Sequence, residues 1–268
     1  MLTLSIQVLY TSVKGTMVQR QQIHEYLDNY LAISDVEDTC VNGLQVEGSE
    51  DVRTLGVAVD AGLSIFDQAI AERVDFLITH HGHFWHSANP SLTGWKKKRI
   101  ELLLENDISL YAAHLPLDRH PEVGNNALLL KLLGTDAHKE FFPHAGALIG
   151  KIGRLPAPTP LGAITEQLEN QLNTQCLPVG DPETAITTVA AVSGGGSYGA
   201  FYSALEAGVD LLLTGDTIEI YHSARDSGLN VIFAGHHATE TLGIRSLGRH
   251  LAKKFDLPVK ELRHPTGL

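Results

Sequence analysis

A short apolar run occurs twice in the chain, and this repeat limits the fold more than any other feature of the sequence. Residues 74–79 and residues 209–214 both read Val-Asp, then three apolar residues, then Thr. A helical pattern precedes each run and a second apolar segment follows it, so each copy is expected to form strand, helix, strand, helix and strand. Strands joined through helices are parallel, with right-handed crossovers. Two unrelated α/β units can look alike, but the matched run favours a duplication. The sequence therefore predicts two related, interlinked α/β lobes with mostly parallel sheets.

The expected lobes divide the 268 residues into four parts. Residues 1–16 precede the first helical pattern and are expected to be a disordered N-terminal extension. The first lobe is expected over residues 17–140 and the second over residues 187–268. Residues 141–186 should connect them, because residues 150–160 hold three prolines and two glycines, the composition of a linker or an edge crossing.

The apolar pattern predicts individual elements within these parts. Helices are expected over residues 18–31, 64–72, 97–105 and 161–172, and buried strands over residues 54–59, 76–79, 110–113, 211–213 and 231–234. A loop is expected over residues 83–94.

Composition excludes some functions. The formal net charge is −11, which repels a nucleic-acid backbone, so extended nucleic-acid binding is not expected. No apolar run approaches the roughly 20 residues that cross a bilayer, so no membrane span is expected. Cys40 and Cys176 lack a Cys-x-x-Cys pattern and are expected to be reduced thiols, the alternative being a metal-binding or nucleophilic thiol. The N-terminus has no basic leader, and the chain is expected to be cytoplasmic.

Imidazoles and carboxylates follow the predicted strands in both copies. His80 and His81 end the strand over residues 76–79, and Asp118 lies shortly after the strand over residues 110–113. In the second copy, His236 and Glu240 follow the strand over residues 231–234. Ligands of open α/β sheets gather beyond the carboxyl ends of the strands. If the lobes face each other, these side chains converge in the cleft between them.

These residue types indicate a pair of divalent metal ions. Imidazole and carboxylate together suit zinc, iron, manganese, nickel or cobalt better than calcium or magnesium. Because neighbouring residues of a strand point to opposite sides, His80 and His81 can each hold a different ion. His236 and Glu240 lie one turn apart on a helix that begins near His236. Asp118 can bridge, and these five ligands fit two ions about 3.5–4 Å apart with open positions for water.

The remaining histidines are weaker candidates for metal ligands. Six of the 14 histidines lie between residues 80 and 120, so clustering alone carries little weight. His83, His86, His120 and His237 are expected in loops or as supports of the ligands. His114 could orient Asp118 or a bound water, and His114 and Glu240 are the candidates for proton transfer.

A glycine-rich motif offers a competing function. Residues Gly194–Gly199 match the spacing G-x-G-x-x-G of a dinucleotide-binding turn, and such a turn can also bind a phosphate. However, Asp210 lies before the next strand, and Asp216 only roughly matches the position of a ribose-binding acid. The alternative is a tight turn that needs positive φ.

The basic run Lys96-Lys97-Lys98-Arg99 is typical of a solvated face, while Trp85 and Trp95 could line a substrate mouth or simply fix the loop.

Four ordered motifs resemble one known family. They are Asn42-Gly43-Leu44-Gln45-Val46-Glu47-Gly48, then His80-His81-Gly82-His83-Phe84-Trp85, then His114-Leu115-Pro116-Leu117-Asp118 with Gly124-Asn125-Asn126, then Gly235-His236-His237-Ala238-Thr239-Glu240. From Met17 onward the chain resembles the Nif-three-like family, whose members are often labelled GTP cyclohydrolase 1 type 2 homologs. The resemblance implies a two-lobed protomer, a dinuclear metal site on His80, His81, Asp118, His236 and Glu240, and a toroidal homohexamer built as a trimer of dimers. It implies no settled reaction.

Three functional hypotheses follow. The first is a metal-dependent hydrolase that acts on a nucleotide or a similar small phosphorylated or cyclic-amide molecule. The second is a non-catalytic metal-handling or regulatory binding protein. The third is a dinucleotide-binding enzyme that uses Gly194–Gly199.

Overall fold

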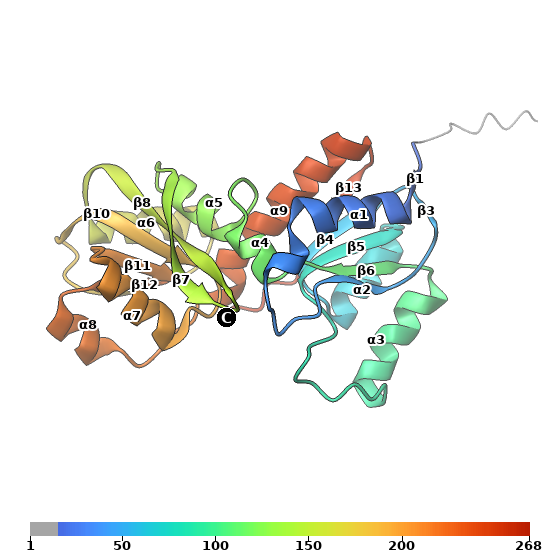
Figure 1. Cartoon of the computed structure of the whole chain (residues 1–268), viewed down its shortest axis with the longest axis horizontal. Coiled ribbons are helices and arrows are strands. Elements are labelled where there is room, and N and C mark those ends of the chain that lie inside the picture. Colours follow the sequence, from blue (N-terminus) through green and yellow to red (C-terminus); the bar gives the residue numbers. More distant parts are fainter. Residues whose placement is uncertain (1–15) are drawn as a thin grey trace, which may run out of the picture.

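The computed structural model describes residues 16–268, which form two α/β lobes side by side with helix α9 (His236–Phe255) between them (Figure 1). The expected extension over residues 1–16 lies outside the described residues, apart from Thr16. The Thr16 hydroxyl donates to Asp256 Oδ2 at 3.3 Å.

The first lobe contains a five-stranded sheet. Its strands, in spatial order, are β13 (Val259–Glu261), β4 (Leu55–Asp60), β5 (Phe76–His81), β6 (Ser109–Ala112) and β2 (Gly43–Val46). Only β2 runs antiparallel to its neighbour. The strands are accompanied by α1 (Arg20–Tyr30), α2 (Leu63–Ala71), α3 (Gly94–Glu105), the short 3₁₀ helix η1 (Ile33–Asp35), and a small ribbon of β1 (Val18–Gln19) and β3 (Asp51–Val52).

The second lobe contains a six-stranded sheet. Its spatial order is β7 (Ala137–His144), β8 (Ala147–Pro160), β10 (Ala185–Val192), β11 (Leu211–Thr214), β12 (Asn230–Phe233) and β9 (Leu177–Val179). The central strands β10, β11 and β12 are parallel, and the other pairs are antiparallel. The helices of this lobe are α6 (Leu161–Leu172), α7 (Ser197–Ala207) and α8 (Tyr221–Ser227).

The two sheets share one plan, as the repeat predicts. In each, three parallel strands lie in chain order and an antiparallel strand borders the third. The repeated aspartates also make the same contacts. Asp75 Oδ2 accepts from the backbone amides of Arg53 and Thr54 at 2.8 and 2.9 Å. Asp210 Oδ2 accepts from the amides of Thr187 and Thr188 at 2.9 and 2.8 Å. Each aspartate thus binds the two residues just before the parallel pairing of the preceding strand begins, at Leu55 and at Val189, which supports a duplication.

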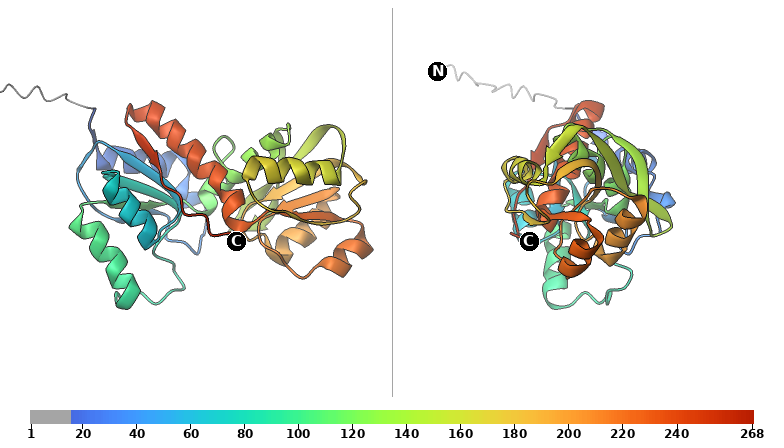
Figure 2. Two further views of the ribbon diagram at one scale, coloured as in Figure 1. Left: turned by 180° about the vertical axis from the view of Figure 1, so that it is seen from behind. Right: turned by 90° about the vertical axis from the view of Figure 1, so that its left-hand side faces the viewer.

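Helices from each repeat pack on the other sheet. After β6 the chain forms α4 (Leu115–Arg119) and α5 (Asn125–Leu132), and α5 packs on β8 and β10 of the second lobe. After β12, α9 packs on β4 of the first lobe, and β13 then pairs with β4. Figure 2 shows α9 crossing from one lobe to the other. This exchange interlinks the lobes and brings the ends of β5, β6 and β12 together.

The sheets do not follow the expected division of the chain. Residues 141–186 were expected to connect the lobes, but they provide half of β7, all of β8 and β9, and helix α6 to the second lobe. The expected linker over residues 150–160 is part of strand β8. Pairing with β7 ends at Gly153, so the prolines lie where β8 has only one neighbour, β10. Proline cannot donate a ladder hydrogen bond, and it is tolerated at such an edge.

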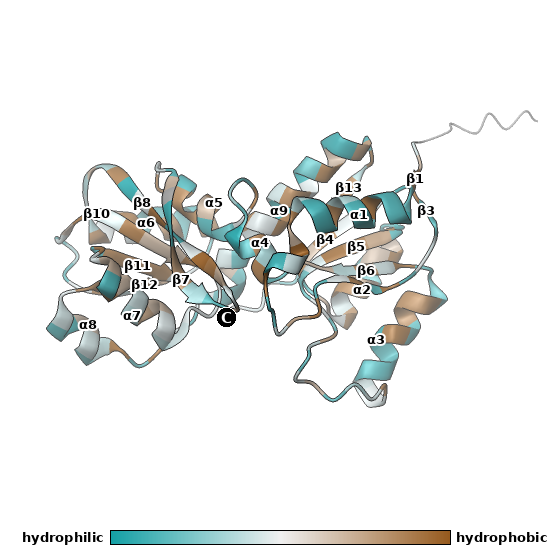
Figure 3. Ribbon diagram, viewed as in Figure 1, coloured by the Kyte–Doolittle hydropathy of each residue, from teal (hydrophilic) through white to brown (hydrophobic). Residues whose placement is uncertain are grey.

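Apolar side chains cover both faces of the central strands. Phe76 and Ile78 pack into one cluster with α9 and α1, and Leu77 packs into another with α2 and α3. This two-sided burial accounts for the continuous apolar run of β5. Figure 3 shows apolar residues concentrated on the strands, with hydrophilic stretches on α1 and α3. No helix of residues 16–268 is both long and apolar enough to cross a membrane.

Candidate metal centre

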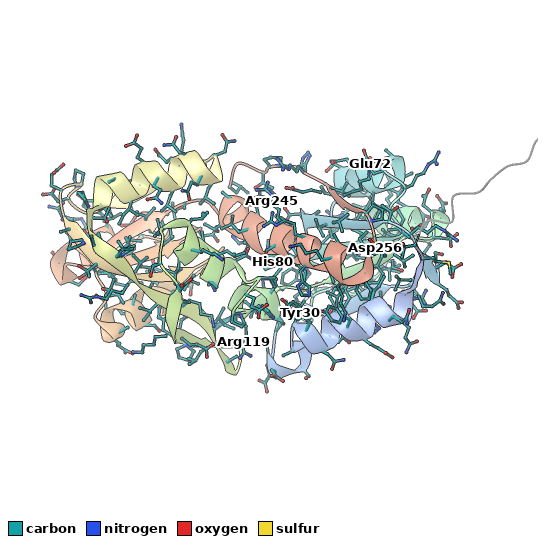
Figure 4. All side chains as sticks on the ribbon, turned by 90° about the horizontal axis from the view of Figure 1, so that it is seen from above. Tyr30, Glu72, His80, Arg119, Arg245 and Asp256 are labelled. Atoms are coloured by element: carbon teal, nitrogen blue, oxygen red, sulfur yellow. The ribbon has the colours of Figure 1, made fainter. Side chains whose placement is uncertain are left out.

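The five predicted ligand residues meet where β5, α4 and α9 come together. Figure 4 shows His80 beside α9 in the middle of the molecule. His80 Nε2 lies 3.3 Å from Glu240 Oε1 and 3.6 Å from Asp118 Oδ2. His81 Nε2 lies 3.2 Å from Glu240 Oε2, and His236 Nε2 lies 3.2 Å from Glu240 Oε1. The Nε2 atoms of His81 and His236 are 3.5 Å apart. Residues from both repeats therefore surround the Glu240 carboxylate.

Local structure sets the positions of His236 and Glu240. Gly235 precedes α9 with a positive φ of 85°, a conformation that favours glycine, and the helix begins at His236. His236 and Glu240 consequently lie one turn apart on the same face, as the sequence predicts.

Each imidazole is fixed through Nδ1, which leaves Nε2 free to face the centre. His80 Nδ1 bonds to the carbonyl oxygen of Ala113 at 2.9 Å. His81 Nδ1 bonds to Asp60 Oδ1 at 2.8 Å, and His236 Nδ1 bonds to Asp216 Oδ1 at 2.9 Å. Metal-binding histidines in proteins are held in this way, because the outer bond sets both the ring orientation and the tautomer.

Asp118 directs one oxygen to the centre and the other away from it. Asp118 Oδ1 accepts from Asn125 Nδ2 at 2.8 Å and from Ser193 Oγ at 2.7 Å. Its Oδ2 is the atom that faces His80. The sequence suggested Asp118 as a bridging carboxylate, but in the structure both oxygens of Glu240, rather than those of Asp118, face imidazoles.

Charge couples the carboxylate and the imidazoles strongly. Burial would raise the pKa of Glu240, but the charge of His80 and the close approach of His236, His80 and His81 hold that pKa well below its usual value. Burial opposes protonation of His81, yet its hydrogen bond to Asp60 and the nearby charge of Glu240 raise its pKa to about 10. The hydrogen bond to Glu240 raises the pKa of His236 to about 9 against the effect of burial. In the metal-free chain, protons therefore supply positive charge around the Glu240 carboxylate.

Two buried atoms at this point lack hydrogen-bond partners. His80 is fully buried and Glu240 is 2% exposed. Within the described residues, neither His80 Nε2 nor Glu240 Oε2 makes a hydrogen bond, although both lie within ion-pair distance of other groups of the centre. An unsatisfied buried acceptor is costly, on the order of 1–3 kcal/mol. Cations would satisfy both atoms, so the donor set fits a metal site.

The ligand atoms form two overlapping groups of three. His80, His81 and His114 form one group and His81, His236 and Glu240 the other, each with ligand atoms within 4.8 Å of one another. His114 thus lies closer to the centre than the sequence indicates. Its ring centroid is 5.1 Å from that of His80.

Asp38, rather than Asp118, is the partner of His114. His114 Nδ1 lies 2.9 Å from Asp38 Oδ1 and 3.0 Å from Asp38 Oδ2. Burial would raise the pKa of Asp38, but the hydrogen bond and charge of His114 hold it far below its usual value. Asp38 and His114 thus form an Asp-His pair through Nδ1, and His114 Nε2 remains free to face the centre.

The supporting carboxylates Asp38, Asp60 and Asp216 were not assigned a structural role by the sequence. Asp60 ends β4 and Asp216 follows β11, so the strand-end rule that identified His80 could have found them. Asp38 lies in a loop before β2, where the sequence gives no such signal. His237 also bonds to Asp60, at 3.3 Å from Nδ1 to Oδ2, in the supporting role expected of it.

The glycine-rich motif makes room for the centre. A Cβ on Gly194, whose φ is +58°, would lie 2.1 Å from Glu240 Oε1, and a Cβ on Gly195 would lie 2.9 Å from Asp216 Oδ2. The amides of Gly194 and Gly196 already donate to the hydroxyls of Thr239 and Thr214, at 3.0 and 3.3 Å. The motif thus has a structural explanation that needs no dinucleotide.

The two cysteines are free thiols outside the group of ligand atoms. Burial raises the pKa of Cys40 and that of Cys176 to about 12. Neither is a thiolate near neutral pH, which disfavours the nucleophilic alternative.

We predict that Asp216→Ala lowers metal affinity without removing a ligand. The variant frees the His236 ring, and loss of such an outer bond typically costs about 10–100-fold in affinity. Competition with a chelator of known affinity would measure it. Asp226→Ala, an exposed change on α8 in the same lobe, is the control. Equal affinities for the two variants would contradict the positioning role of Asp216.

The metal-free chain should also respond to pH in a defined direction. The raised pKa values of His81 and His236 exceed the unfolded value of about 6.5. Their protonation stabilises the metal-free fold below about pH 6.5, and this contribution is lost as the pH rises toward the folded values. Cations that replace the protons bind better at higher pH. The Tm difference between metal-loaded and chelator-treated protein should therefore be larger at pH 8.5 than at pH 6.5. A constant difference would contradict the exchange of protons for metal.

Comparisons with known proteins agree with this fold. The family model described as Duf34/NIF3 (NGG1p interacting factor 3) matches residues 18–265. A curated relative from Archaeoglobus fulgidus, named GTP cyclohydrolase 1 type 2 homolog, is 42% identical over 248 residues, which cover 92% of this chain and 98% of the relative.

Two solved structures cover nearly the whole chain. TTHA1606 from Thermus thermophilus is 44% identical with a TM-score of 0.82, and the match covers 94% of this chain and 100% of the other. The protein ybgI, described as of unknown function, is 38% identical with a TM-score of 0.87 and the same coverage.

Proposed function

The chain belongs to the Duf34/NIF3 family, and from this premise we propose that it binds two divalent metal ions between its lobes and acts as a metal-dependent hydrolase. The observation that supports the metal pair is the convergence of His80, His81, Asp118, His236 and Glu240 around buried atoms that lack partners. Zinc, iron, manganese, nickel and cobalt all suit these ligands.

Glu240 is proposed as the carboxylate shared by the two ions. Its Oε1 faces His80 and His236 and its Oε2 faces His81, so Glu240 would hold the ions together with these imidazoles. Asp118 then contributes Oδ2 alone, because Asn125 and Ser193 occupy Oδ1. A pair of divalent ions supplies a water molecule activated near neutral pH and a positive charge that polarises the substrate.

His114 is proposed as the residue that transfers protons. Asp38 fixes Nδ1, which leaves Nε2 as the atom that takes up and returns a proton. Glu240 is less suited to this task than the sequence suggested, because both of its oxygens face imidazoles. Trp85 lies beside His114, with ring centroids 5.2 Å apart.

The proposed substrate is a nucleotide or a similar small molecule. Relatives carry the name GTP cyclohydrolase 1 type 2 homolog, so GTP is the first compound to test. Purified metal-loaded protein should turn over at least one member of a nucleotide panel, and His80→Ala should not. If both proteins are inert across the panel, the hydrolase proposal fails and a metal-handling role becomes the better account.

We also propose a toroidal homohexamer, a trimer of dimers, in the cytoplasm. The family resemblance supports this assembly. Light scattering coupled to gel filtration should give a mass about six times that of the protomer, and a monomer mass at micromolar concentration would contradict the assembly.

A further inference from the structure

The loop after β5 encloses a cavity beside the candidate metal centre. The cavity has a volume of about 280 Å³, and its lining includes His83, Phe84, Trp85, Leu92 and Lys96. Trp85 borders both the cavity and the centre, because it lines the cavity and its ring centroid lies 6.2 Å from that of His81 and 5.2 Å from that of His114.

Two basic side chains at the start of α3 lie near this cavity without acidic partners. Lys97 pairs with Glu101 at 2.6 Å, whereas in the described part of the chain neither Lys96 nor Arg99 forms an ion pair with a carboxylate. Lys96 lines the cavity and donates to the carbonyl oxygen of Asn89. On a chain with a net charge of −11, two unneutralised cations together mark a local site for an anion.

Arg99 lies against Trp95 and close to Gly62, the residue that precedes α2. Its guanidinium lies 4.8 Å from the centroid of the Trp95 ring, and its Nη2 lies next to Gly62, 3.9 Å from where a Cβ would stand. Burial lowers the pKa of Arg99, and the charge of Asp60 opposes this effect. Since Asp60 holds His81, Arg99 is electrostatically close to the centre.

His83 connects the cavity to Trp95 and Arg99. Its side chain is only 8% exposed, and Nδ1 has no hydrogen-bond partner within residues 16–268. Its ring packs edge-on against Trp95, with centroids 6.2 Å apart.

We propose that Lys96, Arg99 and His83 form a subsite for the phosphate of a substrate whose reacting group lies at the metal centre. The inference rests on the proposed function and specifies its substrate class: a phosphorylated small molecule. Lys96 and Arg99 are three residues apart on α3 and so share one face of the helix, and two cations placed in this way suit a multiply charged anion. The rings of Trp85 and Trp95 provide apolar surface for the rest of the ligand.

The chain offers a built-in reporter for this subsite. Its two tryptophans are Trp85 and Trp95, so all tryptophan fluorescence comes from the walls of the subsite. Metal-loaded protein is titrated with inorganic phosphate, with a nucleoside 5′-monophosphate and with the same nucleoside without phosphate. We expect a saturable fluorescence change with the phosphorylated probes, and at least tenfold weaker binding of the nucleoside.

Matched variants separate this subsite from the metal centre. The double variant Lys96→Gln with Arg99→Gln should weaken binding of the monophosphate at least tenfold, and Lys98→Gln, an exposed change of the same type on α3, should alter it less than twofold. If the double variant binds as the control does, while a chelator abolishes binding, the phosphate binds only to the metal ions and the subsite is overturned. If the double variant loses binding but no nucleotide is turned over, the subsite stands and the hydrolase proposal fails.

Discussion

Glu240→Gln should abolish tight metal binding while leaving the fold in place. The carboxylate is 2% exposed and faces three imidazoles, so its charge supports every part of the centre. Loss of an outer support costs about 10–100-fold in metal affinity, and loss of this shared ligand should cost more than about 100-fold. The amide keeps the size of the side chain, and circular dichroism should show unchanged secondary structure.

The same variant should lose the stability that metal confers. Saturating metal at about 100 times its Kd stabilises a native protein by about 2.7 kcal/mol. Wild type should show this gain by denaturant unfolding, and Glu240→Gln should show little of it. Glu206→Gln, an exposed change on α7, is the control and should behave as wild type. If Glu240→Gln shows the full metal-dependent gain in stability, Glu240 is not a ligand of the centre.

Gly194→Ala should damage the centre although Gly194 has no side chain to bind metal. A Cβ there would lie 2.1 Å from Glu240 Oε1 and 3.2 Å from His236 Nε2, and the φ of +58° is unfavourable for alanine. The Glu240 carboxylate must move, so metal affinity should fall by more than about 100-fold, beyond the effect of losing an outer support. Backbone strain adds a loss of stability of about 1–3 kcal/mol.

A second glycine separates strain from collision. Gly208, at the end of α7, has a φ of +65°, and a Cβ there would meet nothing within 4 Å. Gly208→Ala should therefore lower stability and leave metal affinity unchanged. Equal metal affinities for Gly194→Ala and Gly208→Ala, measured by chelator competition, would show that the glycine-rich loop does not make room for Glu240.

The sequence predicted the features that depend on local pattern. The repeated Val-Asp run indicated two lobes, because a continuous apolar segment between two helical patterns is typical of a buried parallel strand, and this arrangement occurs twice. The strand-end rule placed His80, His81, His236 and Glu240 near one another, and the i, i+4 spacing put the last two on one face of α9. These inferences needed only periodicity and the direction of parallel strands.

Features that depend on tertiary pairing were missed. Residues 150–160 were expected as a linker because of their prolines, yet they extend β8 along β10 beyond the end of β7. Proline content cannot distinguish a linker from the edge of a strand, because neither position needs the backbone N–H that proline lacks. The exchange of α5 and α9 between the sheets also has no local signal, and it is this exchange that brings the two repeats to one centre.

The partners of His114 and Asp118 show the same limit. His114 was expected to orient either Asp118, four residues away, or a bound water. In the structure Asp38 holds His114, while Asn125 and Ser193 hold Asp118. Proximity in sequence favoured the wrong pair, because a packed core chooses its hydrogen-bond partners from distant segments.

An anomalous-scattering scan of crystals grown without added metal tests the metal pair most directly. Two anomalous peaks about 3.5–4 Å apart, bordered by His80, His81, Asp118, His236 and Glu240, are the expected result, and the absorption edge would identify the element. The account would be contradicted if these crystals showed no peak among these side chains and crystals soaked with each candidate metal showed none there either.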